Sequence, residues 1–154
     1  MGDSLRNCCC SPTEIKRYLR KISGPLLDRI DLHITVPRLK YEEMASSRLV
    51  ESSTDIADRV GRARDRQALR LIGTSVFCNA QMNHRQLKEK CLIASTAQNL
   101  LQQAFEQMKL NARSYDRIIK VAQTIADLAG QDVIAAEHMA EALQLRVPAA
   151  ESGM

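Results

Sequence analysis

The sequence is poor in aromatic residues and has no glycine-rich phosphate loop. Of its 154 residues only 3% are aromatic, and tryptophan is absent. This composition argues against a β-sandwich core and against an aromatic platform on which RNA bases would stack. The six glycines are scattered along the chain, so neither G-x-x-x-x-G-K-[ST] nor G-x-G-x-x-G occurs.

Long apolar runs and a paired set of cysteines are also missing. No stretch of 18 apolar residues occurs, and no apolar segment typical of a signal peptide lies within the first 25 residues. The five cysteines are an odd number, and three of them are adjacent at 8–10, which is not the pattern of a disulfide framework. We therefore expect a cytoplasmic protein with reduced thiols and no membrane partner.

Charge is distributed unevenly along the chain. Residues 1–70 contain 14 Lys and Arg against 10 Asp and Glu, whereas residues 71–154 contain eight of each. The excess predicts a surface in the first part that faces phosphates or a protein partner. Five arginines recur on one predicted helix, and a solvated face or contact with phosphate would explain them: Arg59, Arg62, Arg64, Arg66 and Arg70.

Residues 1–40 combine a predicted helix with a single predicted strand. Ser11, followed by proline and then by Glu14, is typical of a capped helix start. The alternating residues 32–36 predict a short strand. A strand needs hydrogen-bonding partners, and residues 75–78 are the best remaining candidate. We therefore expect this part to be the end of a sheet-containing domain whose other strands lie outside the chain.

The remainder is predicted to be a helical bundle after a polar linker at 41–53. Apolar residues recur at helical spacing from 54 to 146, and residues 147–154 are expected to be a loose tail. The expected helix starts are Ser53, Asn83, Ser95, Asn111 and Asp132, and the expected ends include Gly73 and Gly130. In the first of these helices we expect an inward face of Ile56, Val60, Ala63 and Leu69. The predicted fold class is therefore mainly α.

Cysteine and histidine do not indicate a metal site. Cys8 and Cys10 are spaced more tightly than a usual zinc-ligand pair, and no second pair lies near them. Exposed thiols are the simpler interpretation. The histidines have no ligand spacing between them, so structural or solvated roles are expected and no metal is predicted: His33, His84 and His138.

Two arginines stand apart because of their settings. Arg29 lies between apolar and acidic residues immediately before the predicted strand, where its side chain could project toward a neighbour. Arg113 lies two residues after the expected cap Asn111, on the first turn of a long helix. A cation there interacts unfavourably with the helix dipole, so a functional role could explain why an arginine occupies this position. A structural role remains the alternative for both residues.

Two long segments carry a recognisable signature. They are ISGPLLDRIDLH at 22–33 and NARSYDRIIKVAQTIADLA at 111–129. In this order they resemble the C-terminal part of the magnesium-chelatase-like AAA+ ATPases of the ComM/YifB competence-protein type, over about residues 10–146. They are more distantly similar to the replicative MCM helicases.

This resemblance implies a division of the chain and roles for the two arginines. The family has a protease-like N-terminal domain, a Walker-type ATPase core and a helical C-terminal lid. Residues 1–40 would be the end of the core, and 54–146 the lid. Arg29 would be the arginine finger that reaches the γ-phosphate of ATP on a neighbouring subunit. Arg113 would be the sensor-2 arginine, and which subunit's nucleotide it contacts stays open.

The resemblance also implies cofactors and partners. The full-length protein would use ATP and Mg²⁺ in a hexamer that acts on DNA in natural transformation, by branch migration. The alternatives are an ATPase subunit of a magnesium chelatase and a stand-alone helical interaction module. Because this chain lacks the Walker motifs, we expect it to be inactive alone and to bind no nucleotide. Relatives carry two cysteine pairs, of which only Cys8 and Cys10 are matched here.

Overall fold

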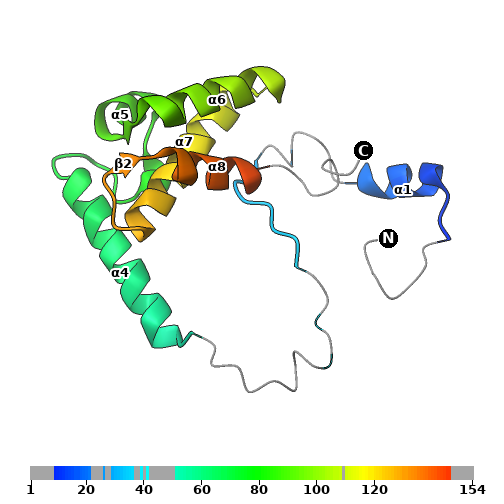
Figure 1. Cartoon of the computed structure of the whole chain (residues 1–154), viewed down its shortest axis with the longest axis horizontal. Helices are drawn as coiled ribbons and strands as arrows, with labels where there is room; N and C mark the ends of the chain where they lie inside the picture. Colours follow the sequence, from blue (N-terminus) through cyan, green and yellow to red (C-terminus); the bar gives the residue numbers. More distant parts are fainter. Residues whose placement is uncertain are drawn as a thin grey trace.

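The structure is a computed structural model, and it describes residues 9–21, 26, 29–36, 39, 41, 51–108 and 110–146. Residues 51–146 form a bundle of helices with one small parallel sheet, while the first helix is drawn apart from this bundle (Figure 1). The prediction of a mainly helical fold is confirmed. The predicted tail at 147–154 and most of the linker at 41–53 lie outside the described residues.

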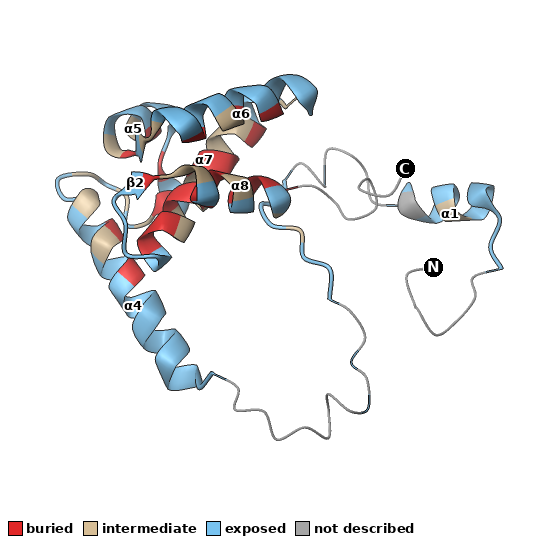
Figure 2. Cartoon of the chain, in the orientation of Figure 1, coloured by how far each residue is buried: buried red, intermediate tan, exposed pale blue. Residues whose placement is uncertain are grey.

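The first helix, α1 (Pro12–Leu19), begins where the sequence predicts. Ser11 Oγ accepts a hydrogen bond from the amide of Glu14, and the Glu14 carboxylate accepts one from the amide of Ser11 at 2.8 Å. These bonds satisfy amide groups that a helix start otherwise leaves unpaired. Its turns are exposed over most of their surface (Figure 2), so the helix has a strong local start and little tertiary support.

The predicted strand at 32–36 is not formed. These residues have no strand assignment, and most of them are exposed, including Ile34 and Val36. The amide of His33 donates instead to the carbonyl oxygen of Leu145 at 2.7 Å. An extended segment becomes a strand only when a neighbouring strand pairs with it, and no such neighbour is present among the described residues.

Helix α4 (Ser53–Arg70) lies against the rest of the bundle through its C-terminal half only (Figures 1 and 2). It is capped by Ser52 rather than by the predicted Ser53, because Ser52 Oγ accepts from the amide of Asp55 at 3.1 Å. Ala63 is buried as predicted. The other predicted inward residues, Ile56, Val60 and Leu69, are 42–70% exposed. The N-terminal half extends past the packed region, which leaves the first two uncovered.

Short elements connect α4 to the centre of the bundle. Gly73, at φ +78°, follows α4 in the left-handed conformation that glycine adopts without strain. The 3₁₀ helix η1 (Asn79–Gln81) and helix α5 (His84–Lys90) follow, and Asn83 caps α5 as predicted. Helix α6 (Ser95–Gln107) begins at the predicted residue.

Helix α7 (Ala112–Leu128) is the central element and contacts α4, α5, η1 and α8. Asn111 caps it through a 2.9 Å bond from the amide of Ser114, and Gly130 ends it at φ +75°. The sequence predicts both the cap at Asn111 and the end at Gly130. Strands β1 (Leu92–Ile93) and β2 (Val133–Ile134) form a parallel pair that the sequence analysis missed. Two-residue strands carry too short an alternation to be detected.

The last helix, α8 (Ala136–Gln144), starts later than predicted. Asp132 is not its cap, because residues 133 and 134 are held in β2 and the Asp132 carboxylate pairs with Arg66. The amide of Ala135 donates to Nδ1 of His138 at 3.1 Å. The core lies between α6, α7 and α8, and its large, fully buried apolar side chains include those of Leu101, Ile118, Ile134 and Met139.

Candidate functional site

Arg113 lies on the first turn of α7 and is exposed to solvent. Within the described part of the chain its side chain has no hydrogen bond or ion pair. The adjacent Ser114 is buried, and its amide bonds to the cap Asn111, so the backbone at this position is fixed. An unpaired cation beside the positive end of a helix is repelled by it and favours an anion as its partner.

Arg29 is exposed on a turn, where its amide donates to the carbonyl oxygen of Leu26 at 3.0 Å. Its side chain has no hydrogen-bond or ion-pair partner among the residues that the structure describes. The two residues after it are attached to the bundle. The carbonyl oxygen of Ile30 accepts from Arg146, and the Asp31 carboxylate pairs with Arg117 at 2.7 Å.

Arg146 brings the two predicted site residues into one region. Its guanidinium donates to the carbonyl oxygen of Ile30, next to Arg29, and to Ser114 Oγ at 3.1 Å, next to Arg113. The sequence analysis did not identify this residue. Two of its acceptors, both among the described residues, lie 116 and 32 residues away in sequence, and no local pattern indicates contacts of that range.

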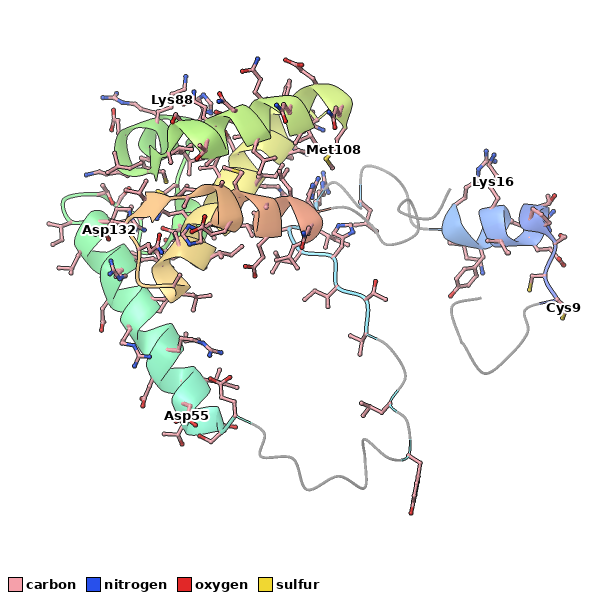
Figure 3. The ribbon with its side chains drawn as sticks, viewed as in Figure 1. Cys9, Lys16, Asp55, Lys88, Met108 and Asp132 are labelled. Atoms are coloured by element: carbon pink, nitrogen blue, oxygen red, sulfur yellow. The ribbon has the colours of Figure 1, made fainter. Side chains whose placement is uncertain are left out.

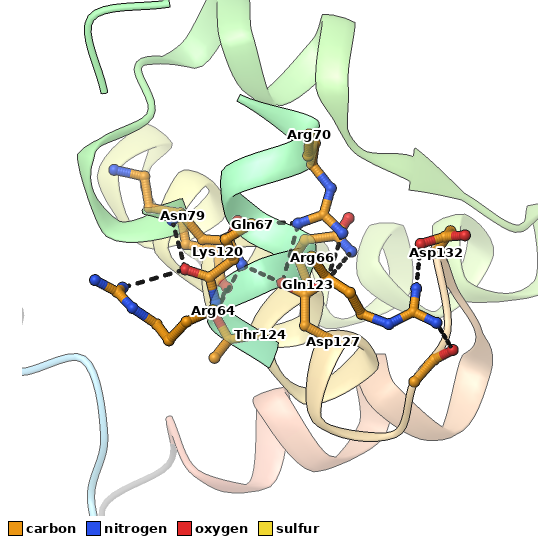
Figure 4. A network of polar contacts seen from close by, with 11 residues as sticks. Arg64, Arg66, Gln67, Arg70, Asn79, Lys120, Gln123, Thr124, Asp127 and Asp132 are labelled. Carbon is orange, nitrogen blue, oxygen red and sulfur yellow. Dashed lines mark hydrogen bonds and ion pairs between the residues drawn. The ribbon is translucent and has the colours of Figure 1, made fainter. Parts of the chain in front are cut away.

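A second polar cluster joins α4 to α7 (Figure 4). Arg70 forms an ion pair with Asp127, whose side chain is fully buried. Asn79 connects the same two residues: its Nδ2 donates to Asp127 at 2.8 Å, and its Oδ1 accepts from Arg70 at 3.1 Å. The interpretation of Arg70 as part of a solvated face is therefore wrong. A buried carboxylate requires such a partner, and α4 supplies it.

The other arginines of α4 are used in different ways. Arg66 donates to the carbonyl oxygen of Gly130 and pairs with Asp132. Arg59 pairs in a bidentate manner with Glu51 at 2.6 and 3.1 Å. Arg62 has no partner among the described residues. Arg66 and Arg70 therefore have structural partners at α7 and the turn after it, while Arg59, Arg62 and Arg64 are exposed.

Histidine side chains have structural contacts. His84 Nδ1 lies 2.7 Å from the Asp116 carboxylate and joins α5 to α7. His138 is buried and accepts a bond from the backbone amide of Ala135. The backbone of His33 bonds to Leu145, and its Nε2 is buried without a hydrogen-bond partner in the described regions. Among the described residues, no group of three His, Cys, Asp or Glu side chains lies close enough together to hold a metal ion.

The cysteines differ in their surroundings. Cys9 and Cys10 are exposed, and Cys8 lies outside the described residues. Figure 3 shows Cys9 beside α1, away from the bundle. Cys91 is buried in the bundle, and burial raises the pKa of its thiol to about 11, although the cation of Arg70 opposes this. None of the described helices is long and apolar enough to cross a membrane.

Comparison with known proteins gives two matches to families and several relatives. The family described as magnesium chelatase, subunit ChlI C-terminal, matches residues 50–146, and that described as magnesium chelatase, subunit ChlI, matches residues 1–44. Competence protein ComM of Haemophilus influenzae is 36% identical over 137 residues, which are 88% of this chain and 26% of the relative.

Two other relatives are similar over almost the same part. The uncharacterized protein YifB of Escherichia coli is 34% identical over 89% of this chain and 26% of its own length. The uncharacterized protein Rv2897c of Mycobacterium tuberculosis is 34% identical over 92% of this chain and 28% of its own length. The chain therefore spans about a quarter of the curated relatives that it matches. With its family match covering 50–146, this chain belongs to the magnesium chelatase subunit ChlI C-terminal family.

Proposed function

We propose that this chain is the lid-bearing C-terminal part of a magnesium-chelatase-like AAA+ ATPase. In this proposal residues 1–40 belong to the end of the ATPase core, 41–53 link it to the lid, 54–146 form the lid, and 147–154 are a tail. The two families that match are consistent with this division, because one covers 1–44 and the other 50–146. The bundle at 51–146 has a core of its own, as a lid domain requires.

In the proposed mechanism Arg29 is the arginine finger and Arg113 is the sensor-2 arginine. The observation that carries this assignment is that Arg146 bonds the residues immediately after both, Ile30 and Ser114. Two exposed guanidinium groups would thereby be presented from one region. Arg29 would stabilise negative charge that develops on the phosphoryl group during transfer, and Arg113 would contact a nucleotide phosphate.

ATP and Mg²⁺ are the proposed cofactors of the longer protein. The residues here fit the phosphate side of that site, because the exposed Arg113 lies at the positive end of a 17-residue helix. ATP would supply the phosphoryl group that is transferred to water. This chain's own contribution is to place two fixed positive charges against phosphate oxygens.

We further propose that the longer protein works as a hexamer on DNA. The competence-protein name of the Haemophilus influenzae relative supports a role of this kind. An ATPase subunit of a magnesium chelatase is the second candidate, which the name of the matching family favours. ATP turnover measured with and without DNA separates them, since DNA should stimulate the motor and leave a chelatase subunit unaffected.

The arginine roles are tested by single substitutions in the longer protein. Arg29→Ala should lower ATP turnover by about 10³-fold while leaving nucleotide binding almost unchanged, which is the size of effect known for arginine fingers. Arg113→Ala should lower turnover and weaken nucleotide binding. Arg62→Ala is the matched control, because Arg62 is also exposed without a described partner. Unchanged turnover in Arg29→Ala would remove this residue from the site.

The division of the chain is tested separately by titrating residues 1–154 with ATP and Mg²⁺ and following the amide NMR signals. A lid without its phosphate loop should show weak shifts confined to the region of Arg113. Tight, saturable binding accompanied by hydrolysis would contradict the proposal, because it would require a complete nucleotide site within these residues.

A further inference from the structure

Arg146 is a buried cation that joins two segments far apart in sequence. Only 7% of the residue is exposed. One terminal nitrogen donates to the carbonyl oxygen of Ile30, and the other donates to Ser114 Oγ at 3.1 Å. The guanidinium group is planar and presents its donors in a fixed fork. Two acceptors that bond to the same fork are therefore held in a fixed relation to each other.

One side of this bridge is rigid. Ser114 is 2% exposed and lies on the first turn of α7, with its amide bonded to Asn111. One turn further along, Ile118 is part of the core. The other side is an extended segment without secondary structure, in which Ile30 itself is 42% exposed. The position of this segment must therefore come from its contacts with the bundle.

Among the described residues at least three polar contacts attach the segment to the bundle, and they differ in strength. The Asp31–Arg117 pair has a carboxylate side chain that is 54% exposed, so water weakens it. The bond from the amide of His33 to the carbonyl oxygen of Leu145 involves backbone atoms only. The Arg146 bridge is the one of the three made by a buried side chain. It is also the one that touches α7 directly beside Arg113.

We propose that Arg146 is a positioning residue, which holds Arg29 in a fixed relation to Arg113. Its consequence for catalysis rests on the proposed function of those two arginines. Arg146 touches no reacting group in this proposal. It acts through the placement of Ile30 and Ser114, and displacement of a reacting group by about 1 Å is enough to lower a rate by about 10²-fold.

The positioning is tested first in this chain by amide hydrogen exchange. Arg146→Met should accelerate exchange at His33 by about 10-fold or more, since the segment is released, while Ala122 in the core of α7 stays unchanged. Arg66→Met is the matched control, because Arg66 also donates to a backbone carbonyl, that of Gly130. Equal exchange at His33 in the wild type and in Arg146→Met would overturn the proposal.

Two more variants distinguish the loss of the Arg146 bridge from a general loss of folding. Ser114→Ala removes only the α7 side of the bridge and should give an intermediate acceleration at His33. Arg146→Lys keeps the charge but loses the fork, so it should restore the slow exchange only in part. Full restoration by lysine would mean that charge alone holds the segment, which contradicts positioning by a forked donor.

The consequence for the reaction is tested in the longer protein. Arg146→Met should lower kcat by about 10-fold or more and leave KM for ATP unchanged, which is the pattern of a lost transition-state interaction. If Arg29→Ala loses turnover and Arg146→Met does not, the positioning role is rejected and the proposed function stands. A different outcome would reject the proposed function. In it, Arg29→Ala and Arg113→Ala keep full turnover, while Arg146→Met still accelerates amide exchange at His33. The Arg146 bridge would then have a structural role only.

Discussion

The helices α1 and α4 start with the same chemistry and have different tertiary surroundings. Each has a serine cap and, three residues later, a carboxylate that bonds back to it: Ser11 with Glu14, and Ser52 with Asp55. Half of α4 packs against α7, whereas α1 stands apart from the bundle (Figure 1). A capping box therefore determines where a helix begins and does not determine whether the helix is anchored.

The largest loss of stability is expected at the buried ion pair that anchors α4 to α7. Arg70→Met leaves the carboxylate of Asp127 buried without its cation, and breaking a buried pair in this way costs about 3–5 kcal/mol. Urea unfolding followed by circular dichroism at 222 nm measures the change. Arg59→Met removes an exposed pair and is the control, with an expected loss below about 1 kcal/mol. Equal losses in the two variants would show that burial does not control this interaction.

Truncating an apolar side chain should lower the unfolding free energy strongly in the bundle and very little in the segment that contains Ile34. Met139→Ala creates a cavity in the bundle core, where the side chain is fully buried, and should cost about 2–5 kcal/mol. Ile34→Ala in the preceding segment should change stability by less than about 0.5 kcal/mol, because Ile34 is 71% exposed. Unfolding midpoints of both variants provide the measurement. A large loss in Ile34→Ala would mean that this segment is packed in solution.

A smaller effect is expected when the caps themselves are removed. Ser52→Ala should lower the unfolding free energy of the bundle by about 1 kcal/mol, the usual cost of a lost N-cap. Ser11→Ala should reduce the helical population of α1, because a helix of eight residues is marginal in water without packing. The bundle's unfolding midpoint should not move. Carbon chemical shifts at residues 12–19 and the urea midpoint distinguish the two outcomes.

The sequence is sufficient to predict the helices but only part of their packing. Helix starts at Ser11, Asn83 and Asn111 follow from local hydrogen bonds, and these predictions are confirmed. The exposure of Ile56 and Val60 could not be predicted in the same way. Their spacing is that of an inward face, but α4 continues past the helix that it packs against.

The candidate site was predictable to a similar extent. The settings of Arg29 and Arg113, together with the resemblance, indicate these two residues, and their roles are proposals. Arg146 and Asp127 were missed because their partners are distant in sequence: Ile30 for the first and Arg70 for the second. A local sequence pattern cannot predict contacts between residues so far apart. The same limit explains the strand predicted at 32–36, which would need partners from outside the described chain.

The smallest expected effects concern the cysteines, because one exposed thiol lies beside α1 and one buried thiol lies in the bundle. Burial raises the pKa of Cys91 to about 11, whereas Cys9 is exposed. At pH 8, iodoacetamide should modify Cys9 in the native chain and spare Cys91, with both modified in urea, as peptide mapping by mass spectrometry would show.

Between pH 9 and about 11 the unfolded chain loses a proton that folded Cys91 keeps, so stability should fall as the pH rises through this window. Cys91→Ser should flatten that part of the stability profile, and an unchanged slope would assign it to other groups.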